Sequence, residues 1–314
     1  MRNDDSATDD GRIAVTGTGL AALGVLAFSF TFPANVLALD GLPPALIGVG
    51  RCAVAALPAG LLLLAVPGPA PRRGDWAGLL VVVGGVLLGY PVLTSLALAH
   101  GSSSAHAAVI IGLLPGATAV CALVRGGERP SRAFWLAAAA GAACVTGFAL
   151  VRGGGGLGGA DLLLLAALLV GAAGYAEGGR IARTLGGPRV ISWALVLAAP
   201  VALPATFAML AGTGPHWTGR TVAGFAYLAF GSSFLGFFAW YAGMARTGIA
   251  RAGQVQLVQP LLTLAWSALL LGEHVDALTA GVAVAVLVCV GATQRARIRR
   301  APVPVPAERL DVAA

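Results

Sequence analysis

The residues that could bind a solute are few, and each lies inside a long apolar run. Arg51 is the most costly of them, because it stands about eight residues into the run that begins near residue 43. A charge at the centre of a bilayer costs roughly 2.5–3.5 kcal/mol on insertion scales, so Arg51 should face other helices or a watery cavity. There it could hold a solute carboxylate, clamp backbone carbonyls or pair with an acid. The sequence leaves these alternatives open.

A stripe of neutral polar side chains follows one face of the run at 252–272. Gln256, Gln259, Thr263 and Ser267 recur every three or four residues, the spacing that places side chains on one side of a helix. Amides and hydroxyls both donate and accept hydrogen bonds, which suits amphipathic solutes such as amino acids or drug-like molecules. Hydrogen bonding between helices is the alternative. The concentration of polarity on one face favours a cavity.

Aromatic and hydroxyl side chains come together in two further runs. Tyr90 and Thr94 lie one helical turn apart, and Ser233 and Trp240 follow one face of the run at 221–245. Aromatic rings beside hydroxyls can form the wall of a pocket and can recognise a cation. All four residues are therefore candidates for substrate binding, with ordinary packing as the alternative.

Glu177 is the one carboxylate placed to titrate inside the predicted helix bundle. It could couple transport to protons, since intramembrane carboxylates often serve in proton relays. It also stands three residues before Arg180, and a local ion pair at the helix end is the favoured interpretation.

Three prolines interrupt apolar runs, at Pro33, Pro115 and Pro260. A proline ring removes one backbone donor and can kink a spanning helix, so hinge or gate roles and static kinks are both possible. The remaining groups suggest no metal site and no cofactor, because their spacing is too scattered. We expect the histidines to face solvent at span ends and the cysteines to pack as small apolar residues: His100, His106, His216, His274, Cys52, Cys121, Cys144 and Cys289.

The elements that must position these residues are membrane-spanning helices. The chain has 314 residues, of which 58% are hydrophobic and 11% charged, with a mean hydropathy of +0.86. Ordinary soluble domains are about a quarter charged, so that class is excluded. Apolar runs broken by Gly, Pro and Arg predict ten spans, near 14–37, 43–66, 76–99, 104–125, 132–151, 161–183, 190–211, 221–245, 252–272 and 275–294. Gly85-x-x-x-Gly89 and Gly174-x-x-x-Gly178 are predicted contact ridges.

The arginines assign sides to these spans. The ten spans place 17 of the 20 basic residues on one side, and all 20 are arginines. Only Arg152 and Arg220 fall on the other side, and Arg51 lies within a span. The positive-inside rule then predicts a multi-pass protein of the cell membrane, with both termini in the cytoplasm. The net charge of +7 therefore reflects membrane topology and does not predict a nucleic-acid partner.

The two halves of the sequence match at a constant offset of 145 residues. Pro115 matches Pro260, Thr118 matches Thr263, and Gly127-Glu128 matches Gly272-Glu273. Each half would hold five helices, an odd number, so the second copy would insert upside down relative to the first. Inverted repeats of this kind are typical of transporters. Chance similarity between two Ala/Gly/Leu-rich stretches is the alternative.

At these residues the sequence resembles the EamA-type branch of the drug/metabolite transporter superfamily, over residues 14–294. The carrying motifs are LLPGATAVCALVRGGERPSRAFWLAAAAGAACVTG, VQPLLTLAWSALLLGEHVDALTAGVAVAVLVCVG, and the opening segment around FSFTFPANVLALDGLPPALIGVGRC. The resemblance implies an all-α membrane protein of ten helices in two inverted five-helix repeats, with a transport site in a central cavity between the halves. It also implies structural capping or repeat-locking roles for Glu128 and Glu273.

The resulting prediction is a secondary transporter of a small amphipathic solute that works by alternating access. The resemblance alone indicates that the direction of transport is export. Either the solute gradient or proton exchange could supply the energy for transport. A membrane-embedded enzyme and a channel are the alternatives, which would need clustered acids and histidines or rings of charge and carbonyls. The expected segments are a disordered cytoplasmic tail (1–13), a first repeat (14–151), a Gly-rich outer linker (152–160), a second repeat (161–294) and a cytoplasmic tail (295–314).

Overall fold

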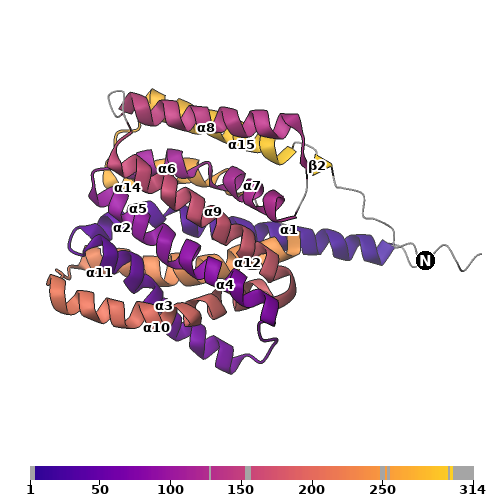
Figure 1. Ribbon diagram of the computed structural model, residues 1–314, viewed down its shortest axis with the longest axis horizontal. Helices are drawn as coiled ribbons and strands as arrows, with labels where there is room; N and C mark the ends of the chain where they lie inside the picture. The colour runs from indigo at the N-terminus through magenta and orange to yellow at the C-terminus, as the bar shows by residue number, and fades with distance from the viewer. Residues whose placement is uncertain are drawn as a thin grey trace, which may run out of the picture.

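The computed structural model describes residues 4–126, 129–152, 157–247, 252, 255–295 and 298–299, and within them the chain is almost entirely helical. Figure 1 shows that most helices run roughly along the long axis of the molecule. The first half contains α1 (Asp4–Ser29), α2 (Thr31–Leu39), α3 (Pro44–Ala65), η1 (Arg73–Asp75), α4 (Trp76–Val82), η2 (Val83–Gly89), α5 (Tyr90–Ala99), α6 (Ser104–Ile111), α7 (Leu114–Gly126), β1 (Arg129–Pro130) and α8 (Arg132–Arg152). The second half contains α9 (Gly159–Leu185), α10 (Gly187–Thr213), α11 (Gly219–Ala226), η3 (Tyr227–Gly236), α12 (Phe237–Thr247), α14 (Gln259–Leu271), α15 (Ala277–Arg295) and β2 (Ile298–Arg299).

The predicted all-helical membrane fold is confirmed. Eight stretches of the described residues are long and apolar enough to cross a bilayer: Thr16–Leu39, Pro44–Ala65, Arg73–Ala99, Ser104–Val124, Arg132–Val151, Gly159–Leu185, Gly187–Thr213 and Gly219–Thr247. The ninth and tenth predicted spans contain shorter apolar helices, Gln259–Leu271 and Ala277–Ala292. The count of ten spans therefore stays a prediction.

Connections that the arginine count assigns to one side meet at one end of the molecule, which we call the arginine-rich end. Arg189, at the start of α10, donates to the backbone oxygens of Val66, Gly68 and Pro69 after α3. Antiparallel pairing of β1 with β2 joins the connection after α7 to the segment after α15. In Figure 1 this end lies to the right, where the chain begins.

The remaining connections meet at the opposite, arginine-poor end. The amide of His216 donates to the oxygen of Gly41 at 2.9 Å, which joins the connection after α10 to that after α2. Arg220 and Asp40 form an ion pair at 3.2 Å across the same two connections. Connections therefore alternate between the two ends, in the order that the span assignment requires.

The two halves repeat in structure as well as in sequence. α7 and α14 begin 145 residues apart, and so do α8 and α15. A two-residue turn precedes α7 at 112–113 and α14 at 257–258. Moreover, the π-helical segments η2 and η3 interrupt corresponding helices in the two halves. One structural unit thus occurs twice.

Small residues allow the helices to approach closely. A Cβ atom on Gly85 would lie 3.4 Å from the Cα of Gly174, so the two predicted glycine ridges pack against each other. A Cβ atom on Gly24 would lie 2.9 Å from the backbone of Trp240. These contacts hold η2 against α9 and α1 against α12.

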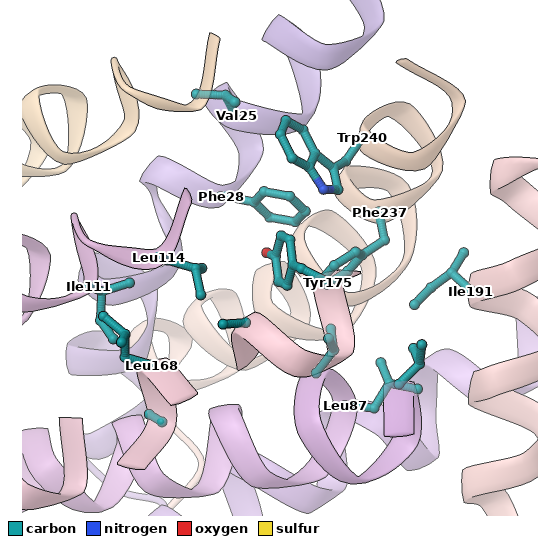
Figure 2. Packing of buried hydrophobic residues seen from close by; sticks show 14 of the residues in the cluster. Val25, Phe28, Leu87, Ile111, Leu114, Leu168, Tyr175, Ile191, Phe237 and Trp240 are labelled. Atoms are coloured by element: carbon teal, nitrogen blue, oxygen red, sulfur yellow. The ribbon is translucent and has the colours of Figure 1, made fainter. Parts of the chain in front are cut away.

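An aromatic cluster fills the centre of the molecule. Figure 2 shows the rings of Phe28, Tyr175, Phe237 and Trp240 gathered between α1, α9 and α12. Their centroids lie 4.6–6.4 Å apart in tilted and edge-on arrangements, the distances that aromatic pairs prefer.

The predicted division into tails, repeats and linker stays a prediction. Helix α1 begins at Asp4, so residues 4–13 continue the first helix. At the other terminus, 298–299 form β2, whereas 300–314 lie outside the described residues. Most of the predicted 152–160 linker, at 153–156, also lies outside them.

Candidate functional site

Pro33 interrupts the first span and frees one backbone oxygen. In an α-helix the amide at position 33 would donate to the oxygen of Ser29, but proline has no N–H. The helix breaks here into α1 and α2. The Thr263 hydroxyl donates to the freed Ser29 oxygen at 2.8 Å, and Trp266 Nε1 donates to Ser29 Oγ at 3.0 Å. The break is therefore held by two side chains of α14.

Pro115 and Pro260 each free one backbone oxygen in the same way, at the two repeat-related breaks. They cannot donate to the oxygens of Ile111 and Gln256, their partners four residues earlier. These four residues all line one pocket, together with Phe32, Ala108, Gly112, Leu114, Gln259 and Thr263. The pocket thus forms where α6–α7, α14 and α2 meet, at the interruptions of three predicted spans. Irregular backbone at membrane depth is tolerated only where it is buried in protein or lines a cavity.

The two repeats contribute opposite chemistry to this pocket. At corresponding positions, Ile111 and Leu114 are apolar, whereas Gln256 and Gln259 are amides. Gln256 is 4% exposed, and the buried Gln259 Oε1 has no hydrogen-bond partner among the described residues. The pocket is therefore amphipathic, and at least one acceptor in it is available. In this conformation it has room for about one water molecule, so a larger occupant requires the helices to separate.

Arg51 lies in a second polar site, beside the first. Its Nε donates to Ser233 Oγ at 2.6 Å and its Nη2 to Ser232 Oγ at 3.0 Å. Ser232 is also hydrogen-bonded to Thr31, which precedes the pocket residue Phe32. Among the described residues, no acidic side chain pairs with Arg51, and its buried Nη1 has no partner. The geometry therefore matches neither the backbone clamp nor the acid pair considered from the sequence.

The π-helical segment η3 explains why two adjacent serines reach the same guanidinium. A π-helix bonds i to i+5 and has more residues per turn than an α-helix, so successive side chains point in more similar directions. Ser232 and Ser233 both lie in η3. Sequence reasoning identified Ser233 and missed Ser232, although adjacency to Ser233 was a usable signal.

The other predicted binding residues are not all brought to Arg51: Trp240 belongs to the aromatic cluster, and Thr94 bonds within its own helix. Tyr90 and Tyr175 lie close enough to Arg51 to interact electrostatically. Thr94 donates to the oxygen of Tyr90 within its own helix, at 2.8 Å. Trp240 is buried in the aromatic cluster, and its Nε1 has no partner among the described residues. Sequence reasoning missed Tyr175, whose place between the glycines of one predicted ridge could have indicated a close contact.

Glu177 lies near the arginine-rich end and does not line the pocket. Arg180 Nε is 3.0 Å from its Oε2, and the same guanidinium is 4.0 Å from Asp75. This is the local pair that the sequence favoured. A proton-coupling role for Glu177 stays a prediction.

A cross-repeat contact lies at the arginine-poor end. Gly272 adopts a left-handed conformation, with φ of 66°, and ends α14. The carboxylate of Glu273 then accepts hydrogen bonds from the amides of Ser104 and Ala105, at 2.9 and 2.8 Å. Ser104 Oγ and Ser267 Oγ are 2.8 Å apart. Glu273 thus caps α6 as the resemblance implied, whereas Glu128 lies outside the described residues.

His106 differs from the predicted solvent-facing histidine. Its Nε2 lies 2.7 Å from Asp161 Oδ1, and its ring stacks on Phe148 at a centroid distance of 5.0 Å. Its side chain is only 16% exposed. The prediction was wrong because His106 lies in the first turn of α6, which packs against α9, whose first turn carries Asp161.

Comparisons with known proteins agree with this architecture. The model of the EamA-like transporter family matches the chain twice, over residues 15–150 and 158–293. The chain is 45% identical over 276 residues to "Uncharacterized transporter YdeK" of Bacillus subtilis (strain 168), covering 87% of this chain and 95% of that protein.

A solved structure described only as a crystal structure of a protein has the same fold. Its TM-score is 0.63 at 19% identity, over 88% of this chain and 97% of that chain. The double family match coincides with the repeated breaks, π-helical segments and helix starts described above. This chain belongs to the EamA-like transporter family.

Proposed function

We propose that this protein is a secondary transporter that moves a small amphipathic solute across the cell membrane by alternating access. The proposal rests on the pocket at the repeat-related helix breaks. The first repeat contributes apolar side chains to its lining, and the second repeat contributes two amides. Transporters with inverted repeats bind their solutes at such discontinuous helices near the middle of the bilayer. The arginine distribution supports cytoplasmic termini.

Gln256, Gln259 and Thr263 are proposed to bind the polar part of the solute. The second repeat contributes these amides and this hydroxyl to the pocket lining, and the first repeat contributes Ile111 and Leu114. These apolar side chains would receive the hydrophobic part. Ser233 bonds Arg51 in the neighbouring polar site. This site is proposed to join the pocket when the helices separate, with Tyr90, Thr94 and Trp240 as further proposed contacts of the solute.

Arg51 is proposed to bind an anionic group of the solute, such as a carboxylate. A buried guanidinium inside a bilayer requires compensation. Here it is compensated only by two serine hydroxyls, and Nη1 is left without a partner among the described residues. A carboxylate accepts hydrogen bonds from two guanidinium nitrogens at once. An arriving carboxylate would satisfy the Nη1 donor and neutralise the charge.

Pro33, Pro115 and Pro260 are proposed hinges, because each marks a break where neighbouring helical segments can reorient. Export as the direction follows from the family resemblance. The energy would come from the solute gradient or from proton exchange through Glu177. Glu177→Gln should then abolish any effect of a pH gradient on transport.

Counterflow in proteoliposomes tests the proposal. Purified protein is reconstituted into vesicles loaded with a panel of unlabelled amino acids, and uptake of each labelled amino acid is measured with and without a pH gradient. A carrier saturates and shows counterflow, a channel shows no counterflow, and an enzyme alters its substrate. Gln256→Leu should raise the KM for uptake while leaving the protein folded, and unchanged kinetics would remove this wall from the site.

A further inference from the structure

The pocket is closed at the arginine-poor end by contacts between the repeats. The carboxylate of Glu273, in the second repeat, accepts hydrogen bonds from the amides of Ser104 and Ala105, in the first repeat. The hydroxyl of Ser267, also in the second repeat, is hydrogen-bonded to the Ser104 hydroxyl. Ser104 and Ser267 are fully buried. We call these four residues the latch. Carboxylate-to-amide hydrogen bonds are charge-assisted and stronger than neutral ones, so the latch stabilises the closed end.

The latch lies directly beyond the pocket along the same helices. Ala108 and Ile111 of α6 line the pocket one and two turns after Ser104, and Thr263 of α14 lines it one turn before Ser267. Because α14 packs against α6, the segments that carry the latch also form the pocket walls. Separation of α6 from α14 would therefore open the pocket toward the arginine-poor end.

A different contact marks where the repeats change least. Cys144 of α8 and Cys289 of α15 occupy corresponding positions, 145 residues apart, on helices that pack against each other. A Cβ atom on Gly141, about one turn before Cys144, would lie 3.3 Å from the Cβ of Cys289. Repeat-equivalent helices that pack against each other lie beside the axis that relates the two halves. α8 and α15 run side by side at one edge of the molecule (Figure 1). Rotation about this axis moves residues on it least and residues at either end most.

We propose that the latch is the gate at the arginine-poor end and that the two repeats rock about the contact between α8 and α15. The inference rests on the proposed alternating access and adds the residues that perform it. Opening the arginine-poor end breaks the bonds to Glu273 and the Ser104–Ser267 contact, and leaves α8 packed on α15. Glu273 acts on access to the pocket without touching the solute.

The first test measures access to the pocket with a cysteine reporter. Gln256→Cys is introduced into a chain whose four native cysteines are replaced by serine or alanine, and a membrane-impermeant maleimide is added from the arginine-poor side. Glu273→Ala should raise the rate of labelling by at least about tenfold, because two charge-assisted bonds are lost. Equal rates with and without Glu273→Ala would overturn the gate assignment.

Asp276→Ala is the matched control. Asp276 lies in the same connection and also accepts a backbone amide, but that amide belongs to Thr279, in the first turn of α15. The substitution removes this cap on α15 and changes none of the four latch residues. Labelling of Gln256→Cys should therefore be unchanged by Asp276→Ala, and an increase equal to that of Glu273→Ala would count against the latch.

Crosslinking provides a second test that does not depend on losing an interaction. Ser104→Cys with Ser267→Cys, oxidised to a disulfide, should reduce labelling of Gln256→Cys from the arginine-poor side to background and preserve it from the other side. A second chain keeps Ser104, Ser267, Cys144 and Cys289 and carries the Gln256→Cys reporter. Oxidation of Cys144 with Cys289 in this chain should leave labelling of the reporter from both sides unchanged. Loss of access from both sides in that second chain would contradict the axis.

The outcomes separate this inference from the proposed function. If Gln256→Cys is labelled from one side only under every condition, alternating access fails. If it is labelled from both sides but neither Glu273→Ala nor the Ser104–Ser267 crosslink changes the rates, the latch fails and the transporter proposal stands.

Discussion

At the residue scale, Thr263 shows how one hydroxyl connects the two repeats. It compensates the backbone oxygen that Pro33 leaves free, at a site buried between α1, α2 and α14. A buried carbonyl without a partner costs about 1–3 kcal/mol, more than the net gain of a typical hydrogen bond. The hydroxyl is therefore expected to contribute to stability, apart from the solute contact proposed for it.

We expect Thr263→Val to lower the free energy of unfolding by about 1–3 kcal/mol, because valine keeps the shape and removes the donor. Thr263→Ser, which keeps the hydroxyl, should recover most of the loss. Thermal denaturation of the purified protein in detergent measures both variants. A valine variant as stable as the natural protein would show that the Ser29 oxygen has another partner.

Arg51 leads to a prediction about solute selectivity. Arg51→Gln should reduce transport of carboxylate-bearing solutes by at least about tenfold, because a charge-assisted pair is lost. Arg51→Lys should retain part of the transport, since it keeps the charge and loses the two-pronged geometry. Counterflow of an amino acid and of its uncharged amide derivative, compared in each variant, measures the effect. An unchanged KM for the carboxylate in Arg51→Gln would assign Arg51 a structural role.

At the element scale, close helix contacts depend on single glycines. A Cβ atom at Gly24 would lie 2.9 Å from the Cα, Cβ and amide nitrogen of Trp240, whereas at Gly19, on the same helix, it would meet nothing within 4 Å. We expect Gly24→Ala to destabilise the protein by about 1–3 kcal/mol through overpacking. Gly19→Ala should be neutral or slightly stabilising, because alanine favours helix.

Thermal inactivation, followed by size-exclusion chromatography in detergent, distinguishes the two glycine variants. We expect a lower midpoint temperature of thermal inactivation for Gly24→Ala only. Equal midpoints for the two variants would mean that α1 and α12 can separate at no cost, in conflict with the packing of α1 on Trp240.

The elements also show what the sequence could and could not predict. Helix breaks at Pro33, Pro115 and Pro260 follow from local chemistry, because a missing N–H acts within four residues. The partners of the freed Ser29 oxygen and of Arg51 do not follow from local chemistry. Thr263 lies 234 positions from Ser29 in the sequence, and Ser233 lies 182 positions from Arg51. Such pairs depend on which helix faces meet. The π-helical segments were also missed, because sequence periodicity does not separate them from α-helix.

At the scale of the whole molecule, the repeat predicted at an offset of 145 explains most of the architecture. Corresponding breaks, π-helical segments and helix starts recur in both halves, and the family model matches both. The divergence between the halves is where the function is proposed to lie. Ile111 and Leu114 correspond to Gln256 and Gln259, so duplication followed by divergence produced a pocket with one apolar and one polar wall.

Inversion of the repeats is the central claim, and a pair of glycines allows a direct test of it. Gly74 and Gly219 are repeat-related, 145 residues apart, and a Cβ atom on either would meet nothing within 4 Å. Each is changed to cysteine in a chain without native cysteines and exposed to a membrane-impermeant maleimide in intact cells and in inside-out vesicles. We expect labelling of Gly219→Cys in intact cells, and labelling of Gly74→Cys in inside-out vesicles only. Labelling of both variants from the same side would contradict it.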